Sequence, residues 1–166
     1  MTAVEVSEHP RRGLLATPSE RLKARLLAML LGAAGFAAAD QWVKAFVTTP
    51  DWAYHHRSAG WFLGSCALFV AMAALSLLPS VGVAVGASLF AGGLLGNMMS
   101  ASADHFYVPN PLLVGHTDGV AFNVADVCIL AGNVTLILAC SAMAIRNRER
   151  IEAWRDTAWA RIRARP

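Results

Sequence analysis

The amino-acid sequence predicts an all-α membrane protein: four transmembrane helices with short extracytoplasmic loops, and both termini in the cytoplasm. Two observations support this prediction. Of the 166 residues, 56% are hydrophobic and 15% are charged, whereas charged residues make up about 25% of an ordinary soluble domain. The charges are also unevenly distributed, because positions 81–102 and 127–145 contain no charged side chain. The length is that of a single domain.

Four windows are long and apolar enough to form membrane-spanning helices. A span needs about 20 mostly apolar residues, because the hydrocarbon core is about 30 Å thick and a helix rises about 1.5 Å per residue. The windows are 26–47, 61–78, 81–99 and 124–145. Only Pro79 and Ser80 separate the second window from the third, so we expect these two helices to form a tight antiparallel pair.

Small residues inside these windows indicate packing rather than chemistry. Glycines four residues apart let helices approach closely in lipid, and the third window contains such pairs at Gly82 and Gly86 and at Gly92 and Gly96. The three cysteines lie in apolar runs and match no metal-binding spacing. We therefore expect the cysteines to be small core residues.

The distribution of Lys and Arg predicts the orientation, because cytoplasmic flanks are enriched in positive charge. Basic residues precede the first window and follow the fourth: Arg11, Arg12, Arg21, Lys23 and Arg25, then Arg146, Arg148 and Arg150. The outer loops, 48–60 and 100–123, contain only Arg57 as a fixed positive charge. This predicts a cytoplasmic N-terminal tail at 1–25, a four-helix domain at 26–145 and a basic cytoplasmic tail at 146–166.

The C-terminal tail has two interpretations. It alternates basic residues with apolar ones such as Trp154 and Trp159. This pattern is typical of a helix lying on an anionic membrane surface, but an ordinary solvated helix end would look similar.

Polar and ionisable residues within or beside membrane spans are costly and therefore candidate functional residues. Six occur here, and on the predicted orientation all of them lie toward the outer side of the membrane: Asp40, Lys44, Asn97, Asp118, Asn123 and Asp126. Their convergence on one side predicts a functional site there.

The spacing of these residues allows structural as well as functional interpretations. Asp40 and Lys44 stand four apart and can pair on one helix face. Asp126 could be an acid that is favoured by the dipole at a helix start. Two carboxylates close together could instead share a proton, so that one activates water while the other donates to a scissile carbonyl. Spacing alone does not show that Asp118 and Asp126 lie close together in space.

Four segments at these residues resemble signal peptidase II, the lipoprotein signal peptidase family. DQWVK at 40–44 resembles the family's Asp-Gln and Lys motif, and GGLLGN at 92–97 its Gly-Gly-x-x-Gly-Asn. AFNVADV at 121–127 resembles Phe-Asn-x-Ala-Asp and is the most specific of the four, while HHRSAGWFLG at 55–64 is a degraded Asn-x-Gly-x-Ala-Phe loop. The chain is identified as a divergent member of this family.

The resemblance implies a membrane aspartic endopeptidase that works as a monomer, without metal or cofactor. It would remove signal peptides from diacylglyceryl-modified prolipoproteins at the outer face of a bacterial inner membrane. Its partners would be prolipoproteins and membrane lipid, and no nucleic acid. Asp126 would be one catalytic aspartate; Asn97 and Asn123 would hold the aspartates and substrate, and Asp40 with Lys44 would brace the site.

Several positions depart from the family pattern. Ser100 and Ala101 replace an Asp-Arg pair, and His56 and Ser58 replace an asparagine and a glycine of the loop motif. The second catalytic aspartate has two candidates: a rearranged loop could supply Asp118, which we favour, or Asn110 could occupy its place. Asparagine exchanges no proton at working pH, so the second alignment predicts little or no peptidase activity.

Three functions therefore remain open at this point. The first is an active signal peptidase II, with Asp118 and Asp126 as the catalytic pair. The second is a catalytically inactive relative that binds lipidated or hydrophobic peptides, which the residues at 100, 101 and 110 favour. The third is a small transporter built around one membrane carboxylate, which a position of Asp126 near the bilayer midplane would favour.

Overall fold

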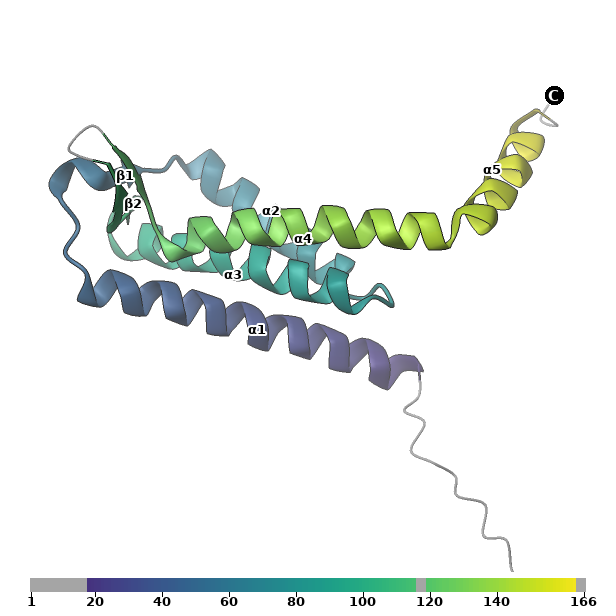
Figure 1. The fold of residues 1–166 in the computed structure, drawn as a ribbon, viewed down its shortest axis with the longest axis horizontal. Coiled ribbons are helices and arrows are strands. Elements are labelled where there is room, and N and C mark those ends of the chain that lie inside the picture. Colours follow the sequence, from purple (N-terminus) through teal and green to yellow (C-terminus); the bar gives the residue numbers. More distant parts are fainter. Residues whose placement is uncertain (1–17, 116–118, 164–166) are drawn as a thin grey trace, which may run out of the picture.

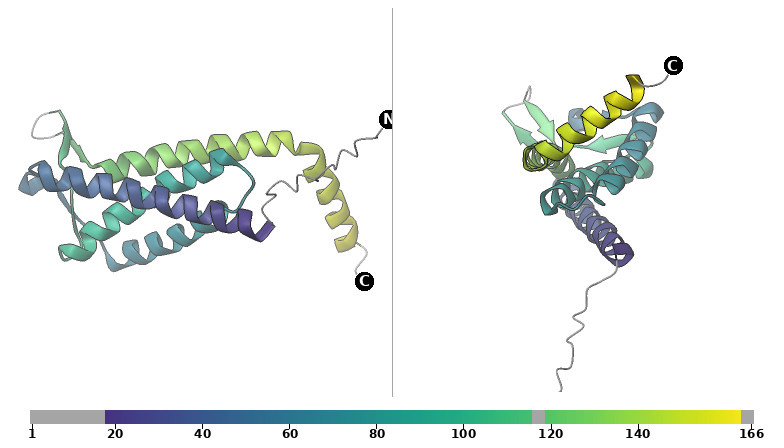
Figure 2. Two further views of the ribbon diagram at one scale, coloured as in Figure 1. Left: turned by 90° about the horizontal axis from the view of Figure 1, so that it is seen from below. Right: turned by 90° about the vertical axis from the view of Figure 1, so that its right-hand side faces the viewer.

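The computed structural model describes residues 18–115 and 119–163, and its main body is a bundle of four helices (Figure 1). These are α1 (Pro18–Phe46), α2 (Ala59–Leu75), α3 (Val81–Ala103) and α4 (Val124–Arg146). A fifth helix, α5 (Arg148–Arg163), follows α4 and runs at an angle to it (Figure 2). Successive helices of the bundle run in alternating directions, so the ends that lead to both termini lie together.

The central helix of the bundle is α3, which packs against α1, α2 and α4. Its glycines divide between two partners. A Cβ atom on Gly92 would overlap Phe36 and Ala33 of α1, whereas one on Gly93 would overlap the carbonyl oxygen of Ala125 in α4. The close packing predicted for these glycines is confirmed, and it brings three helix backbones together where the polar residues lie.

The apolar core occupies the half of the bundle nearer the termini. Its buried members are contributed by all four helices: Met29, Ala33, Met72, Val83, Ala87, Ala91 and Leu136. Three of these seven are alanines, which suits a membrane bundle held by close van der Waals packing of small residues.

Three helices, α1, α3 and α4, are long and apolar enough to cross a membrane. The predicted second span is shorter than expected, because α2 is apolar but ends at Leu75 after 17 residues. A turn from Ser76 to Ser80 follows it, in which Ser76 donates its hydroxyl to the carbonyl of Ala73 at 2.7 Å. The four-span topology and the cytoplasmic placement of the termini stay predictions.

The ends of the chain contain more helix than the tail boundaries suggested. Helix α1 begins at Pro18, within the predicted tail at 1–25, and α5 occupies most of the predicted tail at 146–166. Trp154, on α5, is 73% exposed, as either interpretation of this tail allows.

The loops at the other end form two small antiparallel sheets, which the all-α prediction did not include. Strand β1 (Tyr54–His56), which follows a 3-10 turn at Asp51–Ala53, pairs with β2 (Tyr107–Pro109). Strand β3 (Leu112–Val114) pairs with β4 (Val120–Phe122). Runs of three residues carry too little periodicity to be distinguished from loop by sequence. These strands hold the loop residues against the end of the bundle.

Candidate functional site

Five of the six predicted site residues lie among the described residues, and they form one hydrogen-bonded cluster. Helix α1 contributes Asp40 and Lys44, α3 contributes Asn97, and the start of α4 contributes Asn123 and Asp126. Asp118, the sixth, lies outside the described residues, so its predicted role stays a prediction.

The predicted Asp40–Lys44 pair is confirmed. The Lys44 Nζ atom lies 2.6 Å from Oδ2 of Asp40, and the two side chains are 5% and 0% exposed. Oδ1 of Asp40 accepts the backbone N–H of Ala125 at 2.8 Å, which ties α1 to the first turn of α4. A Cβ atom on Gly96 would lie 2.8 Å from Oδ2 of Asp40, so the carboxylate fills the space above this glycine.

Ser100 completes the hydrogen bonding of the lysine. Besides Asp40, the Nζ atom of Lys44 donates to Oγ of Ser100 at 3.0 Å and to Oδ1 of Asn97 at 3.1 Å, which accounts for its three N–H donors. The hydroxyl of Ser100 donates to the carbonyl of Gly96 at 3.2 Å and also accepts from Gln41 at 3.1 Å. Serine therefore fits this position with its polar atoms satisfied, although the family resemblance leads one to expect an aspartate.

Gln41 is a member of the cluster that the sequence interpretation missed. Its amide nitrogen donates to the carbonyl of Gly96 at 2.7 Å and lies 3.2 Å from Oδ2 of Asp40. The available signal was its place in the DQWVK motif, because a buried glutamine in a membrane helix needs polar partners. Gln41 therefore contributes to the contact between α1 and α3.

Asn97 connects the ion pair to α4. Its Oδ1 atom accepts from Lys44 and from Nδ2 of Asn123, the latter at 2.9 Å, while its Nδ2 atom donates to Oδ1 of Asp126 at 2.9 Å. The residue is 1% exposed. A buried amide with all these partners orients both of its neighbours on α4.

Asn123 and Asp126 form a capping box at the start of α4. Oδ1 of Asn123 accepts the N–H of Asp126 at 2.9 Å, and Oδ2 of Asp126 accepts the N–H of Asn123 at 3.3 Å. Such reciprocal bonds satisfy the free N–H groups of a helix start. Unlike Asp40, the Asp126 side chain is half-buried. It lies in the first turn of α4 beside the loops, so its position does not favour the transporter interpretation.

Asn110 belongs to this cluster as well. Its Oδ1 atom accepts from Nδ2 of Asn123 at 2.6 Å, its Nδ2 atom lies 2.9 Å from Nδ1 of His55, and its backbone N–H donates to the carbonyl of Ala53 at 3.1 Å. Asn110 is 1% exposed. Asn110 is one of the two candidates for the second acid position, and it lies among the described residues. Asn123 is hydrogen-bonded to both Asn110 and Asp126 and so connects them.

Residues of the degraded loop motif cap helix α2 and contact the strands beside the cluster. Ser58, which replaces the family's glycine, is the N-cap of α2 and accepts the N–H of Trp61 at 3.1 Å. His56, which replaces the asparagine, packs against Tyr107 with ring centroids 5.0 Å apart. Its neighbour His55 is the residue that contacts Asn110.

In the part of the chain that the structure describes, no group of three or more His, Cys, Asp or Glu residues could bind a metal ion.

The arrangement of helices resembles that of a solved structure. A solved structure described as that of a bacterial membrane enzyme matches with a TM-score of 0.55, over 74% of this chain and 90% of its own. The chain has the fold of a bacterial membrane enzyme. The two sequences are 16% identical, so the similarity concerns the fold. No protein-family model matches the chain, and no curated protein does.

Proposed function

We propose that the protein binds lipid-modified or hydrophobic signal peptides at the polar cluster without cleaving them, as a catalytically inactive relative of signal peptidase II. It would do so at the outer face of a bacterial inner membrane. The observation that carries the proposal is the position of Asn110, one of the two candidates for the second acid, whose amide is hydrogen-bonded to Asn123 within the cluster. The fold and the four sequence segments support the family.

The chemistry of the cluster favours binding over hydrolysis. An aspartic peptidase needs two carboxylates that share a proton. Among the described residues of the hydrogen-bonded cluster, the carboxylates are Asp40 and Asp126. Asp40 is fully buried, paired with Lys44 and bonded to the backbone of Ala125, so it is already committed to structure. Within residues 18–115 and 119–163, the cluster therefore offers Asp126 no second acid that could donate a proton to a substrate carbonyl.

A groove between α2 and α3 suits an apolar ligand. A groove of about 410 Å³ is lined by residues of α2 and α3: Phe62, Leu95, Met98, Met99, Ser102 and Ala103. Met98 and Met99 follow Asn97 directly on α3. Methionine side chains are flexible and adapt to irregular apolar partners. The apolar part of a lipid-modified peptide would lie along this groove, which is on another face of α3 than Asn97.

Cleavage is the second candidate function, and Asp126 is the observation that favours it. Two asparagines hold this carboxylate, and it is half-buried, so it remains partly accessible. If Asp118 supplied the second carboxylate, the pair could activate water at the outer membrane surface. This candidate would make the protein an aspartic endopeptidase that processes prolipoproteins.

Binding and cleavage can be separated in one experiment on the purified protein in detergent. A diacylglyceryl-modified prolipoprotein is incubated with wild type, Asp118→Asn and Asp126→Asn, and both retention and proteolysis are measured. We expect retention of the modified substrate, weaker retention of an unmodified one, and no cleavage. Cleavage by wild type that is lost in both variants would establish the peptidase instead. Equal retention of modified and unmodified substrates would contradict the binding proposal.

A further inference from the structure

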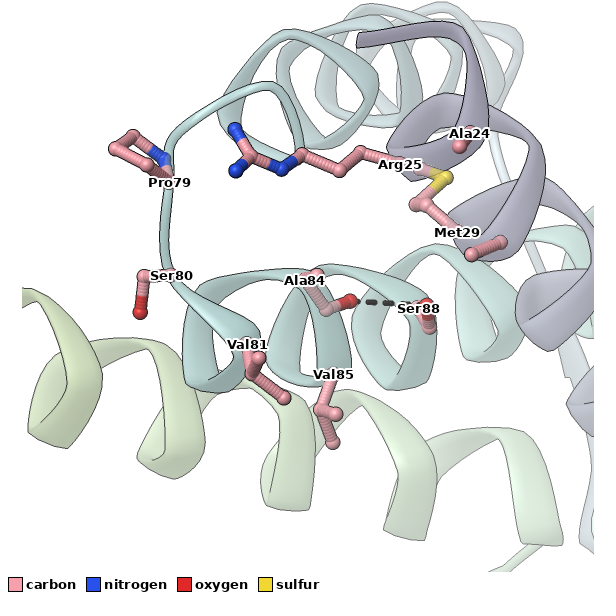
Figure 3. A pocket seen from close by; sticks show the side chains of 10 residues that line it. Ala24, Arg25, Met29, Pro79, Ser80, Val81, Ala84, Val85 and Ser88 are labelled. Atoms are coloured by element: carbon pink, nitrogen blue, oxygen red, sulfur yellow. Dashed lines mark hydrogen bonds between the residues drawn. The ribbon is translucent and has the colours of Figure 1, made fainter. Parts of the chain in front are cut away.

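The end of the bundle that leads to both termini contains a cavity that the proposed function does not use. It measures about 470 Å³ and lies between the start of α1 and the start of α3, beside the turn from α2 (Figure 3). Ligand pockets have volumes of about 300–1,000 Å³, so the volume of this cavity lies within the range of ligand pockets. Its walls are mostly apolar, with Ala28, Met29, Val81, Ala84 and Val85 among them.

Among the described residues, Arg25 is the only charged one that lines this cavity. Its side chain extends from α1 toward the turn at Pro79 (Figure 3), and it donates one hydrogen bond to the carbonyl of Leu77 at 3.2 Å. Within residues 18–115 and 119–163, this is its one hydrogen bond, and it forms no ion pair. A guanidinium has five N–H donors, so most of the donors of Arg25 are available to an anion.

The other polar groups of the cavity are occupied locally. The hydroxyl of Ser88 donates to the carbonyl of Ala84 at 2.9 Å (Figure 3), and the hydroxyl oxygen of Ser80 accepts the N–H of Val83 at 3.4 Å. The interior therefore favours an apolar occupant, while the guanidinium favours an anion. These two preferences together describe a molecule with an anionic head and an apolar chain.

A second cavity adjoins the same turn. It also measures about 470 Å³, shares Pro79, Ser80 and Val81 with the first, and includes Arg146 at the end of α4. An arginine therefore lines each of the two cavities beside this turn.

We propose that Arg25 and the apolar cavity behind it form a site for an anionic glycerophospholipid from the adjacent membrane leaflet. The guanidinium would bind the phosphate, since its planar fork suits phosphate oxygens, and an acyl chain would enter the cavity between α1 and α3. Basic pockets between membrane helices recognise anionic headgroups in this way. The site lies at the opposite end from the polar cluster, so the proposal does not rest on the proposed function.

The test compares lipid binding by matched variants. Purified full-length protein in detergent is titrated with phosphatidylglycerol and, separately, with phosphatidylcholine carrying the same acyl chains. Arg25→Gln is compared with Lys23→Gln, which removes an exposed charge on the same helix that does not line the cavity. Ala28→Phe, which fills the cavity, is compared with Leu27→Phe, whose parent side chain is 57% exposed. Thermal unfolding of each variant shows that it is folded.

We expect wild type to prefer phosphatidylglycerol, and Arg25→Gln to reduce that affinity about fivefold, the effect of one basic residue near an anionic surface. Ala28→Phe should weaken binding of both lipids, and the two control variants should bind as wild type. Equal losses in Arg25→Gln and Lys23→Gln would overturn the site in favour of diffuse surface charge. Unaltered binding by Ala28→Phe would overturn the cavity as the acyl site, and displacement of the lipid by inorganic phosphate would overturn the choice of a lipid.

Discussion

The amide oxygen of Asn110 accepts a hydrogen bond of 2.6 Å from the side chain of Asn123, the residue that caps the helix bearing Asp126. A carboxylate at position 110 could accept the same bond from Asn123. The geometry at this position is therefore compatible with an acid. The asparagine that is present cannot exchange a proton, so it cannot act as the second acid of a peptidase.

Asn110→Asp is expected to introduce peptidase activity. The new carboxylate would give Asp126 a second acid that is not already paired, and it would be held by the same donor, Nδ2 of Asn123. The measurement is cleavage of a diacylglyceryl-modified prolipoprotein in detergent, with Asn110→Ala as the matched control that removes the amide without adding an acid. Cleavage by wild type at the rate of Asn110→Asp would contradict the assignment of Asn110 as the residue that prevents hydrolysis.

Breaking the buried ion pair is expected to destabilise the protein strongly. Asp40→Asn leaves the ammonium of Lys44 without its counter-charge, which costs about 3–5 kcal/mol of unfolding free energy for a buried pair. The exposed pair of Arg148 and Glu152, 78% and 44% exposed, is the control, and Glu152→Gln should change stability by at most about 0.5 kcal/mol. Reversible unfolding in mixed micelles measures both. If Asp40→Asn changed the unfolding free energy as little as Glu152→Gln, the ion pair of Asp40 and Lys44 would not stabilise the fold.

Two identical Gly→Ala changes are expected to have opposite effects. At Gly93 the added methyl would overlap the carbonyl oxygen of Ala125, so α3 and α4 must separate, at a cost of about 1–3 kcal/mol. At Gly35 the same methyl meets nothing within 4 Å, and the higher helix propensity of alanine should raise stability by up to about 1 kcal/mol. Thermal unfolding in one detergent compares them, and destabilisation by both would argue against the packing described for α3.

Two helix caps are expected to differ in importance. Ser58→Ala removes the N-cap of α2, whose side chain accepts from Trp61, and should cost about 1 kcal/mol. Asn123→Ala removes a cap that also donates to Asn97 and Asn110, so it leaves the buried amide oxygen of Asn110 without its donor and adds about 1–3 kcal/mol to that loss. Asn123→Ala should also abolish peptide retention. Equal costs in unfolding experiments would mean that Asn123 acts as a cap alone.

Local features of the molecule could be predicted from the sequence. The apolar windows predicted α1, α3 and α4, because a bilayer requires long uncharged runs. The four-residue spacing of Asp40 and Lys44 predicted their ion pair, and the glycine spacing in α3 predicted close helix contacts. Asn123 and Asp126, three residues apart before an apolar run, matched a helix start. Each of these predictions depends on residues within a single helix.

Only the tertiary structure decided which distant residues meet. Gln41 and Ser100 are 59 positions apart, and Asn97 reaches Asp126 across 29, so no local period could reveal these bonds. The early end of α2 and the three-residue strands also depend on packing against other elements. The position of Asn110 in the cluster is the most consequential case, because its bonds to His55 and Asn123 form only when two loops fold over the end of the bundle.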